Sequence, residues 1–135
     1  MILPDSSVWI ELLRKSGSPA HIALRRLIEE RRDLATAEPV VMEVLAGAPT
    51  SGDALARIRA QLLGLPILRL EGLADFEEAA QIYRSCRAAG DTLRNQIDCL
   101  IAVPAIRHGA SVLASDEDFQ VIARHTGLKL HPVRS

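Results

Sequence analysis

The sequence contains little cysteine, few aromatic residues and no long uncharged apolar run. Its two cysteines, Cys86 and Cys99, stand too far apart to supply a zinc ligand set or a disulfide framework. One Trp, one Tyr and two Phe leave little surface for binding nucleic acid by base stacking. No segment approaches the roughly 18 apolar residues of a membrane span, and the N-terminus lacks the pattern of a secretory signal. These scarcities predict a protein of the cytoplasm, a reducing compartment, without a membrane association.

The composition also lacks the strongly basic character of many domains that bind nucleic acid. Its 16 Lys and Arg residues are offset by 17 Asp and Glu residues, which gives a formal net charge of -1. Any contact with a polyanion must therefore be local. The 135 residues are 48% hydrophobic, which is enough for one core, and we expect a single domain over residues 1–135.

Short apolar segments alternate with amphipathic segments along the whole chain. Segments with helical spacing of apolar residues are bounded by helix start and stop signals such as Pro19, Pro39 and Gly90. Alternation of this kind is typical of a parallel sheet with helical crossovers. The fold class is therefore α/β, a single domain with a short parallel sheet of about four to five strands flanked by helices. The expected strands cover residues 1–4, 33–36, 65–70, 111–114 and 129–131.

Four acidic residues occupy positions that this fold brings together. Asp5 directly follows the first strand, and Asp116 follows the strand that ends at Ala114. Glu43 and Asp98 lie in the first turns of two helices. In a parallel α/β sheet, the starts of helices and the carboxyl ends of strands share one rim, where ligands bind. We therefore expect all four carboxylates at one rim.

The apolar surroundings of two of these acids need an explanation. Asp98 and Glu43 each stand among apolar neighbours, and an unpaired buried carboxylate is costly. Clustered carboxylates repel one another unless a cation binds among them. A set of oxygen ligands alone favours Mg²⁺, or Mn²⁺, over zinc, and Asp5, Asp98 and Asp116 are the expected metal ligands. Such a site suits phosphodiester hydrolysis by a metal-activated water.

Five short motifs follow one another along the chain. They are Asp5-Ser6-Ser7-Val8-Trp9, Val41-Met42-Glu43-Val44-Leu45-Ala46-Gly47, Gly90-Asp91-Thr92-Leu93-Arg94, Asp98-Cys99-Leu100-Ile101-Ala102 and Ser115-Asp116-Glu117-Asp118-Phe119. In this order and spacing they resemble the PIN-domain ribonucleases, most closely the VapC toxins of bacterial VapBC toxin-antitoxin modules. The resemblance implies a Mg²⁺- or Mn²⁺-dependent endoribonuclease that acts on structured RNA such as tRNA or rRNA. It also implies a cognate VapB-type antitoxin and a homodimer within the toxin-antitoxin complex.

The resemblance assigns roles to particular residues. By motif matching, the four acidic residues above fall on the acidic catalytic positions of the family. Asp118 matches a further acidic residue that often assists, and Ser6 matches the hydroxyl that usually follows the first Asp. Where the family commonly has Thr or Asn, this chain has Ala114, and the adjacent Ser115 is the candidate to replace that contact.

Several of these residues also have ordinary structural explanations. Ser115 and Asp118 form a capping-box pattern for a helix over residues 115–125. Ser6 could cap the first helix, and Asp116 could favour a helix N-terminus through the helix dipole. Arg94, beside the expected rim, is the candidate contact for an RNA phosphate.

Two other functions compete with an endoribonuclease. A catalytically silent PIN-like domain that binds RNA or a protein would result if Ala114 disables the site. An aspartyl-phosphate enzyme would use Asp5 as a nucleophile. Haloacid-dehalogenase-like enzymes, however, require Asp where Ser7 stands, and receiver domains require a late lysine near the site. The only late lysine, Lys129, falls in the expected terminal strand.

Overall fold

The computed structural model describes residues 1–133 as five short strands alternating with seven helices. Within residues 1–133, no helix combines the length and the hydropathy of a membrane span. The strands are β1 (Ile2–Pro4), β2 (Thr36–Ala37), β3 (Ile67–Leu68), β4 (Ser111–Leu113) and β5 (Lys129–Leu130). The helices are α1 (Ser6–Arg14), α2 (Pro19–Glu29), α3 (Glu38–Gly47), α4 (Ala54–Leu63), α5 (Leu73–Ala88), α6 (Ile97–His108) and α7 (Asp118–His125).

All strand pairings are parallel, as the alternating pattern predicts. In the first group, β4 lies between β1 and β5, with Ser111 opposite Ile2 on one side and Lys129 on the other. In the second group, β2 pairs with β3. A single bridge between Ile2 and Leu34 joins the groups, and the Ile2 N–H donates to the Asp33 carbonyl at 2.8 Å. The order across the sheet is therefore β3-β2-β1-β4-β5, which confirms the predicted short parallel sheet.

The central strands β1 and β4 mark the point where the order of the chain across the sheet reverses. From β1 the chain continues to β2 and β3 on one side, and β4 and β5 lie on the other. In open parallel sheets, ligands bind at such a point, beyond the carboxyl ends of the strands. Asp5 follows β1 directly, and its N–H donates to the carbonyl of Leu113, the last residue of β4, at 2.8 Å. The segments that leave β1 and β4 therefore start side by side.

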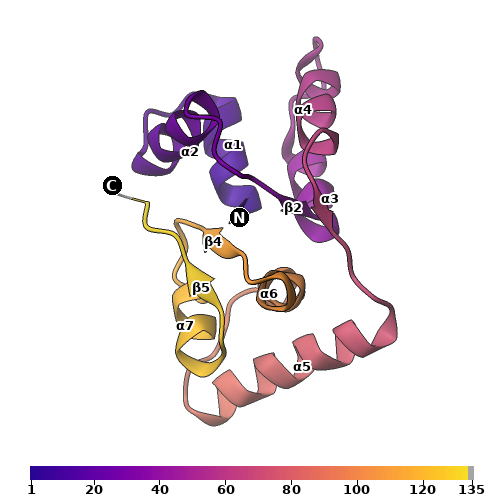
Figure 1. Cartoon of the computed structure of the whole chain (residues 1–135), viewed down its shortest axis with the longest axis vertical. Coiled ribbons are helices and arrows are strands. Elements are labelled where there is room, and N and C mark those ends of the chain that lie inside the picture. The colour runs from indigo at the N-terminus through magenta and orange to yellow at the C-terminus, as the bar shows by residue number, and fades with distance from the viewer. Residues whose placement is uncertain (134–135) are drawn as a thin grey trace.

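The helices pack in two series around this sheet. Helix α1 contacts α2 and α3, and α3 contacts α4, while α5, α6 and α7 contact one another. Helix α3 also contacts α6, which Figure 1 shows end-on near the centre of the molecule, with α5 below it. One hydrophobic core runs through both series, and its largest members, Leu3, Trp9, Leu24 and Phe119, are at most 1% exposed. A shared core is what a single domain requires.

Some predicted boundaries differ from the structure. The second strand was predicted over residues 33–36, but β2 covers Thr36–Ala37, because Leu34 makes only an isolated bridge to Ile2. The third strand covers two residues of the six predicted. The helix expected from residue 115 begins only at Asp118. The Asp116 side chain, and not that of Ser115, accepts a free N–H of the first turn, from Asp118 at 3.1 Å.

Candidate active site

Asp5 is the N-cap of α1 at the carboxyl end of β1. One of its carboxylate oxygens accepts the Ser7 hydroxyl at 2.8 Å and the Ser7 N–H at 3.4 Å. The residue is only 2% exposed. Burial raises the pKa of Asp5; the hydrogen bonds from Ser7 and Ser6 oppose this rise, and the charge of Glu43 adds to it. These hydrogen bonds hold the carboxylate in one orientation, and it forms no ion pair with Lys, Arg or His within residues 1–133.

The Ser6 hydroxyl connects the start of α1 to α3. It donates to Glu43 Oε1 at 2.8 Å and lies 3.5 Å from Asp5 Oδ1. Because Asp5 occupies the N-cap and Ser6 is the first residue of α1, the alternative that Ser6 caps this helix is wrong. Ser6 instead bridges two carboxylates from different helices. Glu43 is half-buried, so its carboxylate is less enclosed than that of Asp5.

Asp98 lies in the first turn of α6 and is 3% exposed. Burial, and then the negative charges of Asp116, Asp5, Asp118 and Glu43, raise its pKa to about 9. An isolated buried carboxylate is expected to be neutral for the same reason. The predicted convergence of the acidic residues is therefore observed, since all of them act on Asp98 through their charges.

Asp116 stands between β4 and α7. Burial, and then the charges of Asp5 and Asp118, raise its pKa to about 6, although the N–H groups of Phe119 and Asp118 donate to it and lower the pKa. Asp116 therefore both contacts the N-terminus of α7 and belongs to the acidic cluster. One oxygen contacts the start of α7 while the side chain remains within reach of the other acids.

Asp118, the first residue of α7, has a contact that neither the capping box nor the family pattern predicts. Its Oδ2 accepts two backbone N–H groups of the loop before α6, from Arg94 at 3.0 Å and from Asn95 at 3.1 Å. The residue is 7% exposed. Because α7 begins at Asp118 with Glu117 as its N-cap, Ser115 lies outside the helix and the capping-box interpretation is wrong.

The two remaining candidates differ in their relation to the cluster. Ser115 is exposed, and no hydrogen bond from its side chain to a carboxylate is present among residues 1–133. The structure therefore gives no support for Ser115 as a replacement for the contact that Ala114 lacks. Arg94 is exposed, and its backbone is bonded to Asp118, which keeps the residue beside the acidic cluster.

Sequence reasoning missed two residues that organise this site. Ser7 donates its hydroxyl to Asp5, and Asn95 Oδ1 accepts the Ile97 N–H at 3.0 Å, at the start of α6. The signal for Ser7 was present in the sequence, since a small hydroxyl two residues after an N-cap Asp can bond to it. Asn95 stands two residues before an apolar helix, which is a usual position for a side chain that satisfies a free N–H.

The cluster contains no compensating cation from the described part of the chain. Within residues 1–133, none of the five carboxylates forms an ion pair with Lys, Arg or His. In the same residues, no three Asp, Glu, His or Cys side chains gather closely enough to hold a metal ion by themselves. Mg²⁺ keeps several waters and commonly takes one or two carboxylates directly. The uncompensated negative charge of the cluster therefore favours a hydrated divalent cation, of which one or two carboxylates would be direct ligands.

The PIN domain family matches residues 2–125 of this chain. The chain belongs to this family. VapC ribonuclease Mb1587 from Mycobacterium bovis is 46% identical over 130 residues, which cover 96% of each protein. Ribonuclease VapC11 from Mycobacterium tuberculosis has the same identity and coverage. The predicted resemblance to VapC-type PIN proteins is confirmed, and the aspartyl-phosphate alternative has no support.

A solved structure extends the comparison to the fold. The crystal structure of VapBC2 from Rickettsia felis, bound to a DNA fragment from their promoter, matches with a TM-score of 0.71. The match covers 97% of this chain and 98% of that chain at 18% identity, so it bears on the fold alone. The predicted PIN fold is confirmed. VapC-type PIN ribonucleases generally depend on a metal, in agreement with the uncompensated charge of the acidic cluster.

Proposed function

We propose that this PIN domain is the toxin of a toxin-antitoxin pair, an endoribonuclease that hydrolyses structured RNA such as tRNA or rRNA with Mg²⁺, for which Mn²⁺ can substitute. The observation that carries the proposal is a group of buried and half-buried carboxylates at the switch point of the sheet with no cation partner in residues 1–133. Relatives of 46% identity named as ribonucleases support the reaction. RNA as substrate and two cysteines that are free thiols support a cytoplasmic location.

The acidic residues of the cluster have different roles in this proposal. Asp5, Asp98 and Asp116 are the proposed ligands, each directly or through a water of the hydrated cation, and burial raises the pKa of all three carboxyl groups. Glu43, tied to Asp5 through Ser6, orients the attacking water and accepts its proton. The cation supplies positive charge at the scissile phosphate and makes an attacking water more acidic. No side-chain nucleophile is required.

Arg94 is the proposed contact for a phosphate that flanks the scissile bond. Its side chain is exposed and forms no ion pair within residues 1–133, while its backbone is anchored at the acidic cluster. A guanidinium beside the cluster would supply a local positive charge for a phosphate, although the chain as a whole has a net charge of -1.

A VapB-type antitoxin is the proposed protein partner. A cluster of carboxylates without an internal cation can accept an arginine from a partner as well as a metal ion. An arginine inserted there would replace the charge of the metal and block the site. Relatives of 46% identity are named VapC, the type of toxin for which the sequence predicts a VapB-type antitoxin, and they support this pairing.

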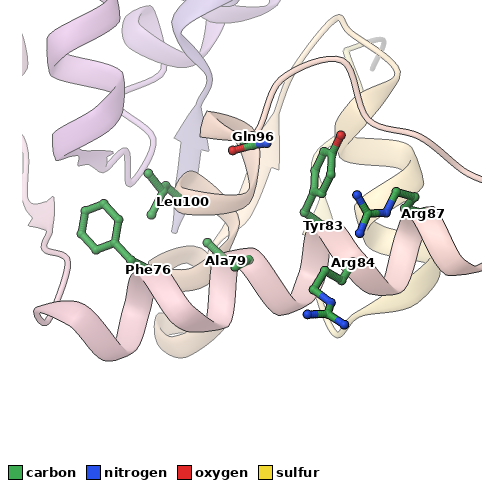
Figure 2. A pocket seen from close by; sticks show the side chains of 8 residues that line it. Phe76, Ala79, Tyr83, Arg84, Arg87, Gln96 and Leu100 are labelled. Atoms are coloured by element: carbon green, nitrogen blue, oxygen red, sulfur yellow. The ribbon is translucent and has the colours of Figure 1, made fainter.

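We also propose a homodimer that forms through the exposed face of α5. Leu73 is 75% exposed and Phe76 is 48% exposed, and helical spacing places Ala80 and Arg87 on the same face. Figure 2 shows Phe76 beside Leu100 of α6 along a groove between the two helices. Aromatic and Arg side chains with few carboxylates are typical of interface centres.

Charges along this face favour a second copy of the chain. Glu77 lies toward the N-terminus of α5 and Arg84 toward its C-terminus; both are exposed, and neither forms an ion pair within residues 1–133. In a two-fold pair of antiparallel α5 helices that cross near Ala80, Glu77 of each copy faces Arg84 of the other. The small side chain of Ala80 permits close approach at the crossing.

Charge reversal tests this interface. We expect wild-type protein to sediment as a dimer, Arg84→Glu as a monomer, and the pair Glu77→Arg with Arg84→Glu as a dimer again, because the reversed charges match once more. Sedimentation equilibrium on the whole chain gives the masses. A wild-type monomer, or a dimer that persists in Arg84→Glu, would overturn the α5 interface.

The activity itself is tested with purified protein and total RNA, by mapping the new ends. We expect cleavage with Mg²⁺, none with EDTA, and a loss of more than about 100-fold in Asp5→Asn, because a lost metal ligand costs more than a lost neighbour of a ligand. Asp53→Asn, an exposed acid on the surface, is the matched control. RNA that binds without being cut under every metal condition would support the catalytically silent alternative instead.

A further inference from the structure

The contact between Asp118 and the loop before α6 is made through a single oxygen. Asp118 Oδ2 accepts both the Arg94 N–H and the Asn95 N–H, at 3.0 and 3.1 Å. Two adjacent backbone N–H groups that point at one acceptor fix the path of the chain between them. The Asp118 side chain, at the start of α7, therefore determines where this loop lies, although the two segments are more than 20 residues apart in the sequence.

This loop in turn determines where α6 begins. Asn95 Oδ1 accepts the Ile97 N–H at 3.0 Å, and the Asn95 carbonyl accepts the Asp98 N–H at 3.3 Å. Gln96, the N-cap of α6, makes no side-chain capping bond. The first turn of α6 therefore depends on Asn95, whose own N–H is held by Asp118. Asp98, the second residue of α6, is placed by this series of contacts.

Asp118 also contacts the other side of the cluster. Its backbone N–H donates to Asp116 Oδ1 at 3.1 Å. One residue thus orients Asp116 through its amide and the segment carrying Asp98 through its carboxylate. These are two of the three acids proposed to hold the cation.

We propose that Asp118 is a positioning residue, which sets the separation of Asp98 and Asp116 through backbone hydrogen bonds and does not itself need to bind the cation or the substrate. The proposal rests on the proposed function of the acidic cluster. It differs from the role implied by the family resemblance, in which Asp118 is a further acid that assists the chemistry. The contacts require only an acceptor oxygen at this position, whereas a carboxylate that binds a divalent cation also contributes its negative charge, which asparagine lacks.

Asparagine separates these two roles, because its amide oxygen can accept the same two N–H groups without carrying charge. We expect Asp118→Asn to cleave RNA within about threefold of wild type with an unchanged Mg²⁺ midpoint. Asp118→Ala should lose about 100-fold, the order expected for a misplaced catalytic group. Asn95→Ala should resemble Asp118→Ala, since it breaks the next contact of the series. Glu117→Gln, an exposed neighbour in the sequence, is the control.

A second measurement does not depend on cleavage. Amide hydrogen exchange of residues 94–98 in metal-free protein should speed up by about tenfold or more in Asp118→Ala and stay at the wild-type rate in Asp118→Asn, because only the alanine variant frees the two N–H groups. If the protein cuts no RNA but shows this exchange pattern, the proposed function fails while the positioning contact stands.

Two results would overturn the proposal. The first is a loss of cleavage in Asp118→Asn as large as that in Asp118→Ala, with a higher Mg²⁺ requirement, which would identify Asp118 as a ligand. The second is wild-type exchange in residues 94–98 of Asp118→Ala, which would show that the loop keeps its place without this side chain.

Discussion

Two acidic residues of this protein are equally buried but have opposite surroundings. Asp98 and Asp75 are each 3% exposed. Asp75 accepts the Glu71 N–H at 2.7 Å and pairs with the guanidinium of Arg107, and these contacts lower its pKa. Asp98 has no such cation among residues 1–133, and burial raises its pKa to about 9. Asp75 joins α5 to the C-terminal end of α6, whereas Asp98 lies at the opposite end of the same helix.

The difference separates a structural acid from a functional one. A buried carboxylate with an internal partner has its charge compensated within the fold, and removal of that partner is strongly destabilising. A buried carboxylate without one is unfavourable in the folded protein and gains from an external cation. The half-buried Asp91 is also compensated within the fold, because its carboxylate lies 2.8 Å from His125 and 3.6 Å from Arg124, and its pKa is lowered. Burial alone therefore does not identify the active site.

The largest expected effect is that of a substitution at Asp98 on the rate of RNA cleavage. Asp98→Asn should lower RNA cleavage by more than about 100-fold, because it removes a proposed metal ligand. The same variant should unfold at a temperature about 5 °C higher in EDTA at pH 9, since the amide needs no compensating cation. Cleavage rates and thermal unfolding on the same preparation check both. An Asp98→Asn protein that is active, or less stable than wild type in EDTA, would break the comparison.

The structural acid should behave in the opposite way. Arg107→Ala should lower the melting temperature by about 8 °C, because it leaves the Asp75 carboxylate buried without its partner. Its cleavage rate per folded molecule should stay within about twofold of wild type, as for other substitutions away from the reacting groups. Arg57→Ala, which removes an exposed ion pair with Asp53, is the control and should shift the melting temperature by about 1 °C or less.

The dependence of stability on pH should follow the acidic residues whose pKa is raised in the folded protein. Asp98 and Asp116 have folded-state pKa values of about 9 and about 6, above the ordinary 3.8. Their neutral forms are favoured by folding, so their contribution to stability is present below about pH 4 and is lost as the pH rises through 6 and then 9. Metal-free protein should lose about 5 °C in melting temperature between pH 5 and 9, and Mg²⁺ should recover it. A flat profile without metal would contradict the prediction.

The smallest expected effect concerns the hydroxyl between two carboxylates. Ser6→Ala should lower cleavage by about tenfold, because Asp5 and Glu43 lose the group that fixes their separation. Cleavage should remain metal-dependent, since the ligands are intact. Ser51→Ala, at an exposed position between α3 and α4, is the matched control. Equal rates for the two variants would show that Ser6 only fills space.

Much of the fold could be predicted because it depends on local patterns. Helix α2 starts at Pro19 behind Ser18, whose side chain accepts the His21 N–H at 3.2 Å, as its start signals indicate. The short strands were located less well. β2 and β3 have two residues each, and their limits are set by partners across the sheet, which periodicity does not describe.

Strand ends, helix starts and motif spacing are properties of chain order, which is why the fold class, the family and the convergence of Asp5, Glu43, Asp98 and Asp116 could be predicted. The contacts of each side chain could not be predicted in this way, because they depend on how the segments pack in space. The tertiary structure separated Asp98 from Asp75, which have the same burial, by the presence of Arg107. It also directed Asp118 to a loop more than 20 residues away, because a hydrogen bond depends on where two segments meet in space.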